Sequence, residues 1–274
     1  MESFIQLFSY GFMQNALIAG VLASIICGII GVYIMLKRIV FMSGGIAHAS
    51  FAGIGLGYLL KLNIFLSTLF FAVLSAFGIG AIKKHTKINE DSTIGILWAF
   101  GMALGIIFVG LSKGYSINLL DYLFGNIMMV SRQDIAIMAA LAFAAIVFSV
   151  LLYKEYLIFI FDEEYGKVIG LPVAFLYYLL LAFVALSIVV LMKIVGIILV
   201  IALLTILPSA GRMLSNNVRN IMIISVLLSV FSVMLGLFMS YYFDLASGAT
   251  IILSASFVFA LVFSLKKLPA FIRH

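Results

Sequence analysis

Charged residues are scarce in this sequence. Only 9% of its 274 residues are charged and 66% are hydrophobic, whereas soluble domains carry roughly 25% charged and 45–50% apolar residues. Cysteine is scarcer still, because Cys27 is alone, so neither a disulfide framework nor a thiolate metal cluster can form within the chain. A water-soluble globular domain is therefore excluded.

Motifs of catalysis and nucleotide binding are also missing. The sequence contains no H-E-x-x-H, no G-x-S-x-G and no G-x-x-x-x-G-K-[ST], the motifs of zinc proteases, serine hydrolases and nucleoside triphosphatases. The net charge of +6 comes from basic residues that stand singly or in pairs at the ends of apolar runs, a pattern typical of membrane topology signals. We therefore expect no enzyme, no ATPase domain, no bound cofactor and no nucleic-acid partner.

Long apolar runs are what the sequence does have. Each of nine runs is about 20 residues long, enough to cross a hydrocarbon core of roughly 30 Å. They predict an all-α polytopic membrane helical bundle with eight or nine transmembrane helices. A tenth segment, about 119–130, is too short to span, and we expect it to lie at the interface or to re-enter the membrane. The nine runs cover about 13–36, 43–60, 64–82, 93–112, 134–153, 172–192, 194–211, 220–242 and 247–265.

Basic residues indicate the orientation of the chain in the membrane. With nine spans and the amino terminus outside, 12 of the 16 Lys and Arg residues fall in cytoplasmic segments. Cytoplasmic loops are the ones that collect such residues. The sequence thus predicts a multi-pass protein with its amino terminus outside and its carboxyl terminus in the cytoplasm.

Small residues recur at helical spacing. Gly45, Ala49, Gly53 and Gly57 repeat every four residues in the second run. Such stripes let helix backbones approach closely where hydrophobicity cannot drive association. We expect similar contacts in the first and fourth runs, along Gly20, Ser24, Gly28, Gly101 and Gly105.

His48 is an ionisable residue inside an apolar run. An ionisable side chain at membrane depth is costly unless it faces protein or water, and the small residues Gly44 and Ala52 in its helical row leave room for the ring. Burial favours the uncharged imidazole, which is the form that ligates a metal. The ring is therefore a candidate metal ligand that faces another helix. The alternative is a hydrogen-bonded histidine that packs between helices.

Asp244 is the second candidate for contact with a cation. It falls at the outer end of the eighth run, where a carboxylate could attract a cation to a gate. Equally, it could cap the ninth helix, because carboxylates stabilise helix amino termini. The sequence alone leaves both roles open.

The longest segment between runs is cytoplasmic in the predicted orientation. Within residues 154–171, the stretch DEEYGKVIG places acids before a short amphipathic turn, and Gly170 and Pro172 act as stop signals. This order predicts a short helix with favourable charge at its positive end. The segment could dock in the groove of another protein or form an ordinary surface loop.

Six motifs in order give the chain a family resemblance over nearly its full length. It resembles the integral-membrane permease subunits of ATP-binding-cassette importers for zinc, manganese and related metals. The resemblance implies a single permease domain over residues 1–274, similar to type II importer permeases such as those for vitamin B12 and siderophores. The motifs are SGGIAHASFAGIGLG, TIGILWAFGMALGIIF, DYLFGNI, DEEYGKVIGLPV, VGIILVIALLTILPSAGR and YYFDLASGATIIL.

The resemblance also implies partners, a location and site residues. It implies a homodimer in a bacterial or archaeal plasma membrane, two cytoplasmic ATPase subunits and an extracytoplasmic metal-binding protein. His48 would match the membrane histidine on the path of a divalent metal ion, with zinc, manganese and iron as candidates. The cytoplasmic loop would couple transport to the ATPase through Asp162, Glu163, Glu164, Gly166 and Gly170.

Two departures from the family pattern concern these site residues. Many relatives have Asp one helical turn before the membrane histidine, where this chain has Gly44, and many read D-x-P-x-G where it has Asp244, Ala246 and Gly248. Without this carboxylate, the sequence does not identify the transported metal. One alternative is a permease of the same architecture for a siderophore or corrinoid chelate. Another is a secondary cation transporter without an ATPase, but such proteins usually place carboxylates in mid-membrane, and this chain has none there.

Overall fold

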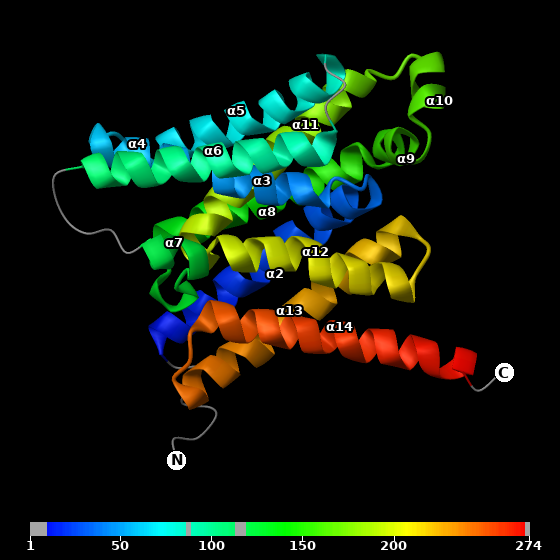
Figure 1. Cartoon of the computed structure of the whole chain (residues 1–274). Helices are drawn as coiled ribbons and strands as arrows, with labels where there is room; N and C mark the ends of the chain where they lie inside the picture. The colour runs from blue at the N-terminus through cyan, green and yellow to red at the C-terminus, as the bar shows by residue number, and fades with distance from the viewer. Residues whose placement is uncertain (1–9, 86–88, 113–118, 272–274) are drawn as a thin grey trace. The chain divides into compact units, whose positions relative to one another are not determined.

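The computed structural model describes residues 10–85, 89–112 and 119–271, and these residues form helices without any strand (Figure 1). The order along the chain is α2 (Gly11–Leu36), α3 (Val40–Ala49), α4 (Phe51–Leu59), α5 (Ile64–His85), α6 (Glu90–Leu111), α7 (Leu119–Phe124), the short 3-10 helix η1 (Ile127–Met129), α8 (Arg132–Leu151), α9 (Tyr153–Phe161), α10 (Glu163–Val168), α11 (Val173–Val195), α12 (Ile197–Leu214), α13 (Val218–Phe243) and α14 (Ser247–Phe271).

Membrane-spanning helices make up most of the described chain. Within it, nine helical segments are long and apolar enough to cross a membrane, with α3 and α4 together forming the second. These nine segments coincide with the nine apolar runs, so the predicted all-α polytopic fold is confirmed. The tenth segment contains only α7 and η1, of six and three residues, and is too short to span, as predicted.

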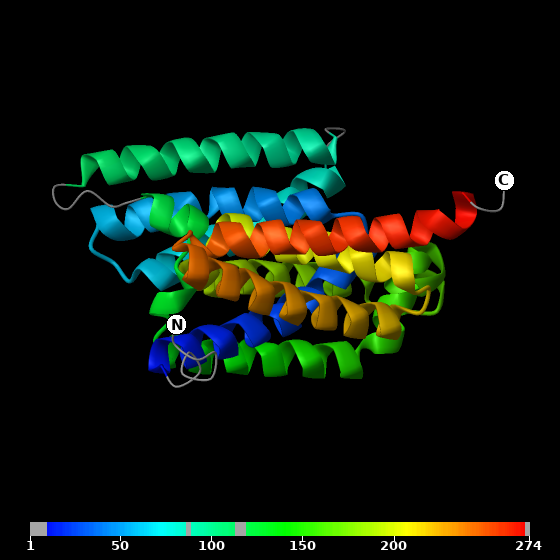
Figure 2. The ribbon, with the colours of Figure 1, turned by 90° about the horizontal axis from the view of Figure 1, so that it is seen from below.

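The chain divides into two compact units, each assembled from segments far apart in the sequence. The first contains Met1–Leu36, Leu120–Leu151 and Lys193–His274, and the second contains Lys37–Leu119 and Leu152–Met192. Within the first unit, α2 contacts α8, α12 and α13, while α14 contacts α12 and α13. Figure 2 shows α14 running along α13. The single permease domain over residues 1–274 stays a prediction.

Glycines of the first span bring α2 against α13. A Cβ atom added at Gly20 would lie closer than 3.0 Å to a methyl carbon of Val233, and one added at Gly28 would lie equally close to Val226. Side chains at these positions would push the helices apart. The close packing that the small residues of the first run predict is therefore confirmed.

Three of the six motifs meet at a backbone junction in the first unit. Gly125 and Gly196 adopt left-handed conformations, with φ of 65° and 83°, which only glycine adopts without cost. A Cβ at Gly125 would collide with the backbone of Val195, and one at Gly248 would collide with the carbonyl oxygen of Phe124. The chain crosses itself here without room for any side chain.

In the second unit, the predicted small-residue stripe contacts two different helices. Gly45 lies against Ile94 of α6, and Ala49 lies against Gly101 of the same helix. Gly53 and Gly57, the later members of the stripe, instead face α5, where Ser67 donates a hydrogen bond to the Gly53 carbonyl at 2.7 Å. The change of partner lies on either side of Ser50, where the second span breaks between α3 and α4.

Candidate functional site

His48 lies on α3 with its ring against α6. The imidazole stacks on the indole of Trp98, with ring centroids 4.0 Å apart and planes inclined by 9°. The prediction that the ring faces another helix is therefore confirmed. The sequence reasoning missed Trp98, although a signal was present, because Ile94, Trp98, Gly101 and Gly105 follow one another at steps of four, three and four residues and so share one face of α6.

One nitrogen of the His48 ring has no hydrogen-bond partner in the described chain. This nitrogen is Nδ1, and it is buried. Gly44, one turn before it, is buried and contributes no ligand. The part of the chain that the structure describes holds no cluster of three or more His, Cys, Asp or Glu side chains suited to a metal. The site therefore offers a bare imidazole rather than a closed coordination shell.

Asp244 ends α13. It occupies the C-cap in a left-handed conformation with φ of 50° and ψ of 46°, its N–H donates to the carbonyl of Ser240, and its side chain is exposed. The next helix, α14, begins at Ser247. A role for this carboxylate at an ion gate stays a prediction.

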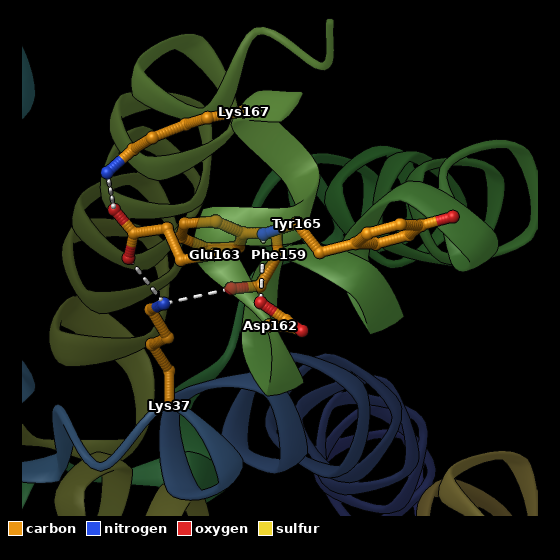
Figure 3. Close-up of polar contacts among 6 residues, drawn as sticks. All are labelled: Lys37, Phe159, Asp162, Glu163, Tyr165 and Lys167. Atoms are coloured by element: carbon orange, nitrogen blue, oxygen red, sulfur yellow. Dashed lines mark hydrogen bonds and ion pairs between the residues drawn. The ribbon is translucent and has the colours of Figure 1, made fainter. Parts of the chain in front are cut away.

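The loop that the sequence predicts to be cytoplasmic folds into two short helices, α9 and α10. Asp162 separates them and caps α10, because its Oδ1 atom accepts a hydrogen bond from the Tyr165 N–H at 2.9 Å (Figure 3). Glu163 and Glu164 occupy the first turn of α10 and Lys167 the last, an order that opposes each end of the helix dipole with the favourable charge. The predicted short helix is confirmed, whereas α9 was not anticipated.

Glu163 is the centre of a charged cluster. Figure 3 shows its carboxylate between two lysines, 3.0 Å from Lys37 and 3.4 Å from Lys167. The Lys37 ammonium also donates to the Phe159 carbonyl at 2.9 Å and lies 4.0 Å from the centre of the Phe159 ring. Lys37 thus ties the end of α9 to the start of α10.

The electrostatics of the cluster favour the charged form of Glu163. Partial burial alone would raise the pKa of this carboxyl, but the hydrogen bond and charge of Lys37, reinforced by Lys167, outweigh burial and hold the pKa below its ordinary value. The cluster lines an open cleft of about 410 Å³ beside Tyr177 and Tyr178, so water and salt reach it. The sequence did not indicate this role of Lys37, because a lysine at the end of an apolar run is interpreted only as a signal of membrane topology.

The remaining predicted coupling residues differ in exposure. Gly166 is buried, and Gly170 follows α10 in a left-handed conformation with φ of 83°. Glu164 is exposed. Beside it, α10 and its C-cap expose the apolar side chains of Tyr165, Val168 and Ile169, with Val168 83% exposed. The helix therefore turns its glycine inward and presents an acid and an apolar group outward.

Comparison with known proteins identifies the family. A model described as the ABC 3 transport family matches residues 9–266. The manganese transport system membrane protein MntC of Halalkalibacterium halodurans is 34% identical over 260 residues, which cover 95% of this chain and 89% of MntC. A probable iron transport system membrane protein of Haemophilus influenzae is also 34% identical, covering 93% of this chain and 94% of the relative.

A solved structure supports the same assignment. PsaBC from Streptococcus pneumoniae in complex with Fab includes a chain that is 34% identical, with a TM-score of 0.86 and coverage of 95% of this chain and 94% of that chain. The family model extends over all nine spans of the described chain, and the structural match covers nearly the whole chain, so the likeness concerns the whole fold and not a single motif. The chain belongs to the ABC 3 transport family, and the resemblance to importer permeases that its six motifs predict is confirmed.

Proposed function

We propose that this chain is the permease subunit of an ATP-dependent importer of divalent metal ions, with manganese as the first candidate substrate. The observation that carries this proposal is the match to MntC, a manganese transport protein that aligns with 95% of the chain. The Haemophilus relative makes iron the second candidate. Zinc as a substrate is supported only by the resemblance of the motifs.

The proposed importer requires other subunits. The sequence has no nucleotide-binding motif, so two separate cytoplasmic ATPase subunits would hydrolyse ATP, and an extracytoplasmic protein would deliver the metal. Two copies of this chain would enclose the path. The distribution of basic residues supports an outer amino terminus and a cytoplasmic carboxyl terminus. In that orientation α9 and α10 would face the ATPase.

His48 is proposed to contact the ion inside the membrane. A neutral imidazole is a good ligand for first-row divalent metals, and His48 carries one inside a membrane-spanning segment. A single imidazole binds loosely, which suits a path from which the ion must leave. Asp244 would attract the cation at the outer end of α13, where its carboxylate is exposed.

The helix α10 is proposed to couple ATP hydrolysis to transport. Its outward residues, Glu164, Tyr165 and Val168, would contact the ATPase. Asp162 and Glu163 would act within the chain, because their carboxylates already bind the Tyr165 N–H and Lys37. Closure of the ATPase pair would then move α10 and change which side of the path is open.

Reconstitution tests the proposed function. The complex with its ATPase and metal-binding protein is placed in liposomes, and uptake of radioactive manganese, iron and zinc is measured with and without ATP. We expect ATP-dependent manganese uptake that falls about tenfold in His48→Ala, a loss typical of removing a metal-site contact. His85→Ala, at the end of α5, is the control.

Two outcomes would contradict the proposal. Metal uptake that continues without ATP would identify a secondary transporter. Uptake of a metal chelate but not of the free ion, together with unchanged uptake in His48→Ala, would identify a chelate permease.

A further inference from the structure

We infer that Trp98 is a positioning residue that fixes the plane of the His48 imidazole for the passing ion. This inference rests on the proposed function of His48 as a ligand on the metal path. Nothing in the family motifs assigns a role to Trp98, and the inference comes from its contact with the ring.

A ligating imidazole must be oriented. It binds a metal through a nitrogen lone pair that lies in the plane of the ring, so rotation of the ring moves the lone pair off the ion. The terminal torsion of a histidine side chain is broad and does not select one orientation by itself. Proteins usually select it by a hydrogen bond from the second ring nitrogen to a carboxylate or carbonyl.

His48 lacks that usual restraint. Its Nδ1 atom is buried without a hydrogen-bond partner among the described residues. Gly44 stands one turn away, where a carboxylate side chain would be within reach. The contact that does define the ring plane is the stack on Trp98.

The stack can replace the missing hydrogen bond. The rings are 4.0 Å apart and only 9° from parallel, so the indole covers one face of the imidazole. Rotation of the imidazole would drive its edge into the indole, and aromatic stacking opposes that change. Both ring nitrogens lie on the edge, which a parallel stack leaves uncovered. The stack therefore restrains the plane of the ring, and the indole does not cover the ring nitrogens.

Close helix packing holds Trp98 at the height of His48. One turn before it, Ile94 lies against Gly45, and one turn after it, Gly101 lies against the backbone of Ala49. These contacts lock α6 to α3 on both sides of the stack. The indole itself is 39% exposed, so its position is explained by α3 and not by deep burial in a core.

Uptake by variants tests the inference. In the reconstituted complex, Trp98→Leu should lower manganese uptake about tenfold, the lower end of losses when an outer contact of a metal ligand is removed. Trp98→Phe keeps a flat aromatic ring, so this variant should retain most of the manganese uptake. Phe100→Leu is the matched control, because Phe100 lies on the same helix and is 60% exposed. ATPase activity and assembly are measured in each variant.

A double mutant distinguishes positioning from a structural role. If Trp98 acts only through His48, Trp98→Leu has no further effect on uptake in a His48→Ala background. Additive losses, or equal uptake by Trp98→Leu and the wild type, would overturn the inference. If the wild-type complex takes up no metal at all, the proposed function fails instead.

Fluorescence provides a second measurement that needs no transport. Trp98 is the only tryptophan of the chain, so the emission of the purified full chain reports this stack alone. Paramagnetic manganese should quench it saturably, and His48→Ala should abolish saturation. Quenching that rises linearly with concentration in the wild type would mean collisions only and would overturn the inference, even if Trp98→Leu does not fold.

Discussion

The short helix α10 and the histidine of α3 differ in how their polar groups are paired. Around α10, Asp162 binds a backbone N–H, and Glu163 binds two lysines. His48 has an aromatic neighbour and a buried ring nitrogen without a partner in the described chain. In this comparison the two carboxylates of α10 have partners within the chain, whereas a ring nitrogen of the candidate ligand has none among the described residues.

The difference has an energetic reason. A helix of six residues is unstable alone, so α10 needs its cap and its ion pairs to have a defined shape. The helix α3 is held by backbone contacts with α6 and needs no polar bond from His48. The ring can therefore stay unsaturated, at the cost of an unpaired polar atom.

The largest expected effect is on the helix contact beneath His48. A Cβ at Gly101 would lie closer than 3.0 Å to the Cα and carbonyl oxygen of Ala49, and backbone atoms cannot move aside. We expect Gly101→Ala to destabilise the purified chain by about 1–3 kcal/mol, measured as a lower thermal midpoint, and to alter Trp98 emission. Gly95→Ala is the control on the same helix, because a Cβ there meets nothing within 4 Å. Equal midpoints for the two variants would contradict the packing argument.

A smaller effect is expected from the charged cluster. Lys37→Met keeps the apolar stem but removes the hydrogen bonds to Glu163 and the Phe159 carbonyl. The free energy of unfolding should fall by about 1–2 kcal/mol. A charge-assisted hydrogen bond is worth about 1.5–3 kcal/mol, and solvent weakens this one because Glu163 is partly exposed. We expect metal uptake per ATP hydrolysed to fall several-fold.

The matched control for that variant is Lys154→Met, an exposed lysine on α9. It removes the same charge from the same side of the membrane without touching the cluster. Equal coupling ratios in the two lysine variants would show that net charge, and not the bond to Glu163, matters for coupling.

The smallest expected effect is a pH dependence. The pKa of the Glu163 carboxyl is held below its ordinary value of 4.5. Its ion pairs therefore stabilise the fold fully above about pH 4.5, and this contribution is lost as the pH falls further, through the lowered pKa. Thermal midpoints of the wild type and Glu163→Gln are compared from about pH 7 to about pH 3. The difference between them should be constant at first and narrow below 4.5; a difference that narrows near neutral pH would contradict the assignment.

Much of the architecture could be predicted because it depends on local composition. The nine apolar runs correspond to the nine spans of the described residues, and DEEYGKVIG forms a capped helix. Run length, hydrophobicity and capping are properties of neighbouring residues. The candidate ligand His48 was also visible, because one histidine in an apolar run is conspicuous. Its surroundings were not, because Trp98 comes from another helix.

The sequence by itself determined that this is a membrane protein, to which family it belongs, and which face of α3 carries the histidine. A low charge content, apolar runs of about 20 residues and a glycine spacing of four residues are all local properties of the chain. Only the tertiary structure decided that Trp98 covers His48, that the glycine stripe divides between α5 and α6, and that Lys37 binds Glu163, 126 residues away. Such contacts depend on where helices cross, and the crossing is set by the summed packing of whole helices.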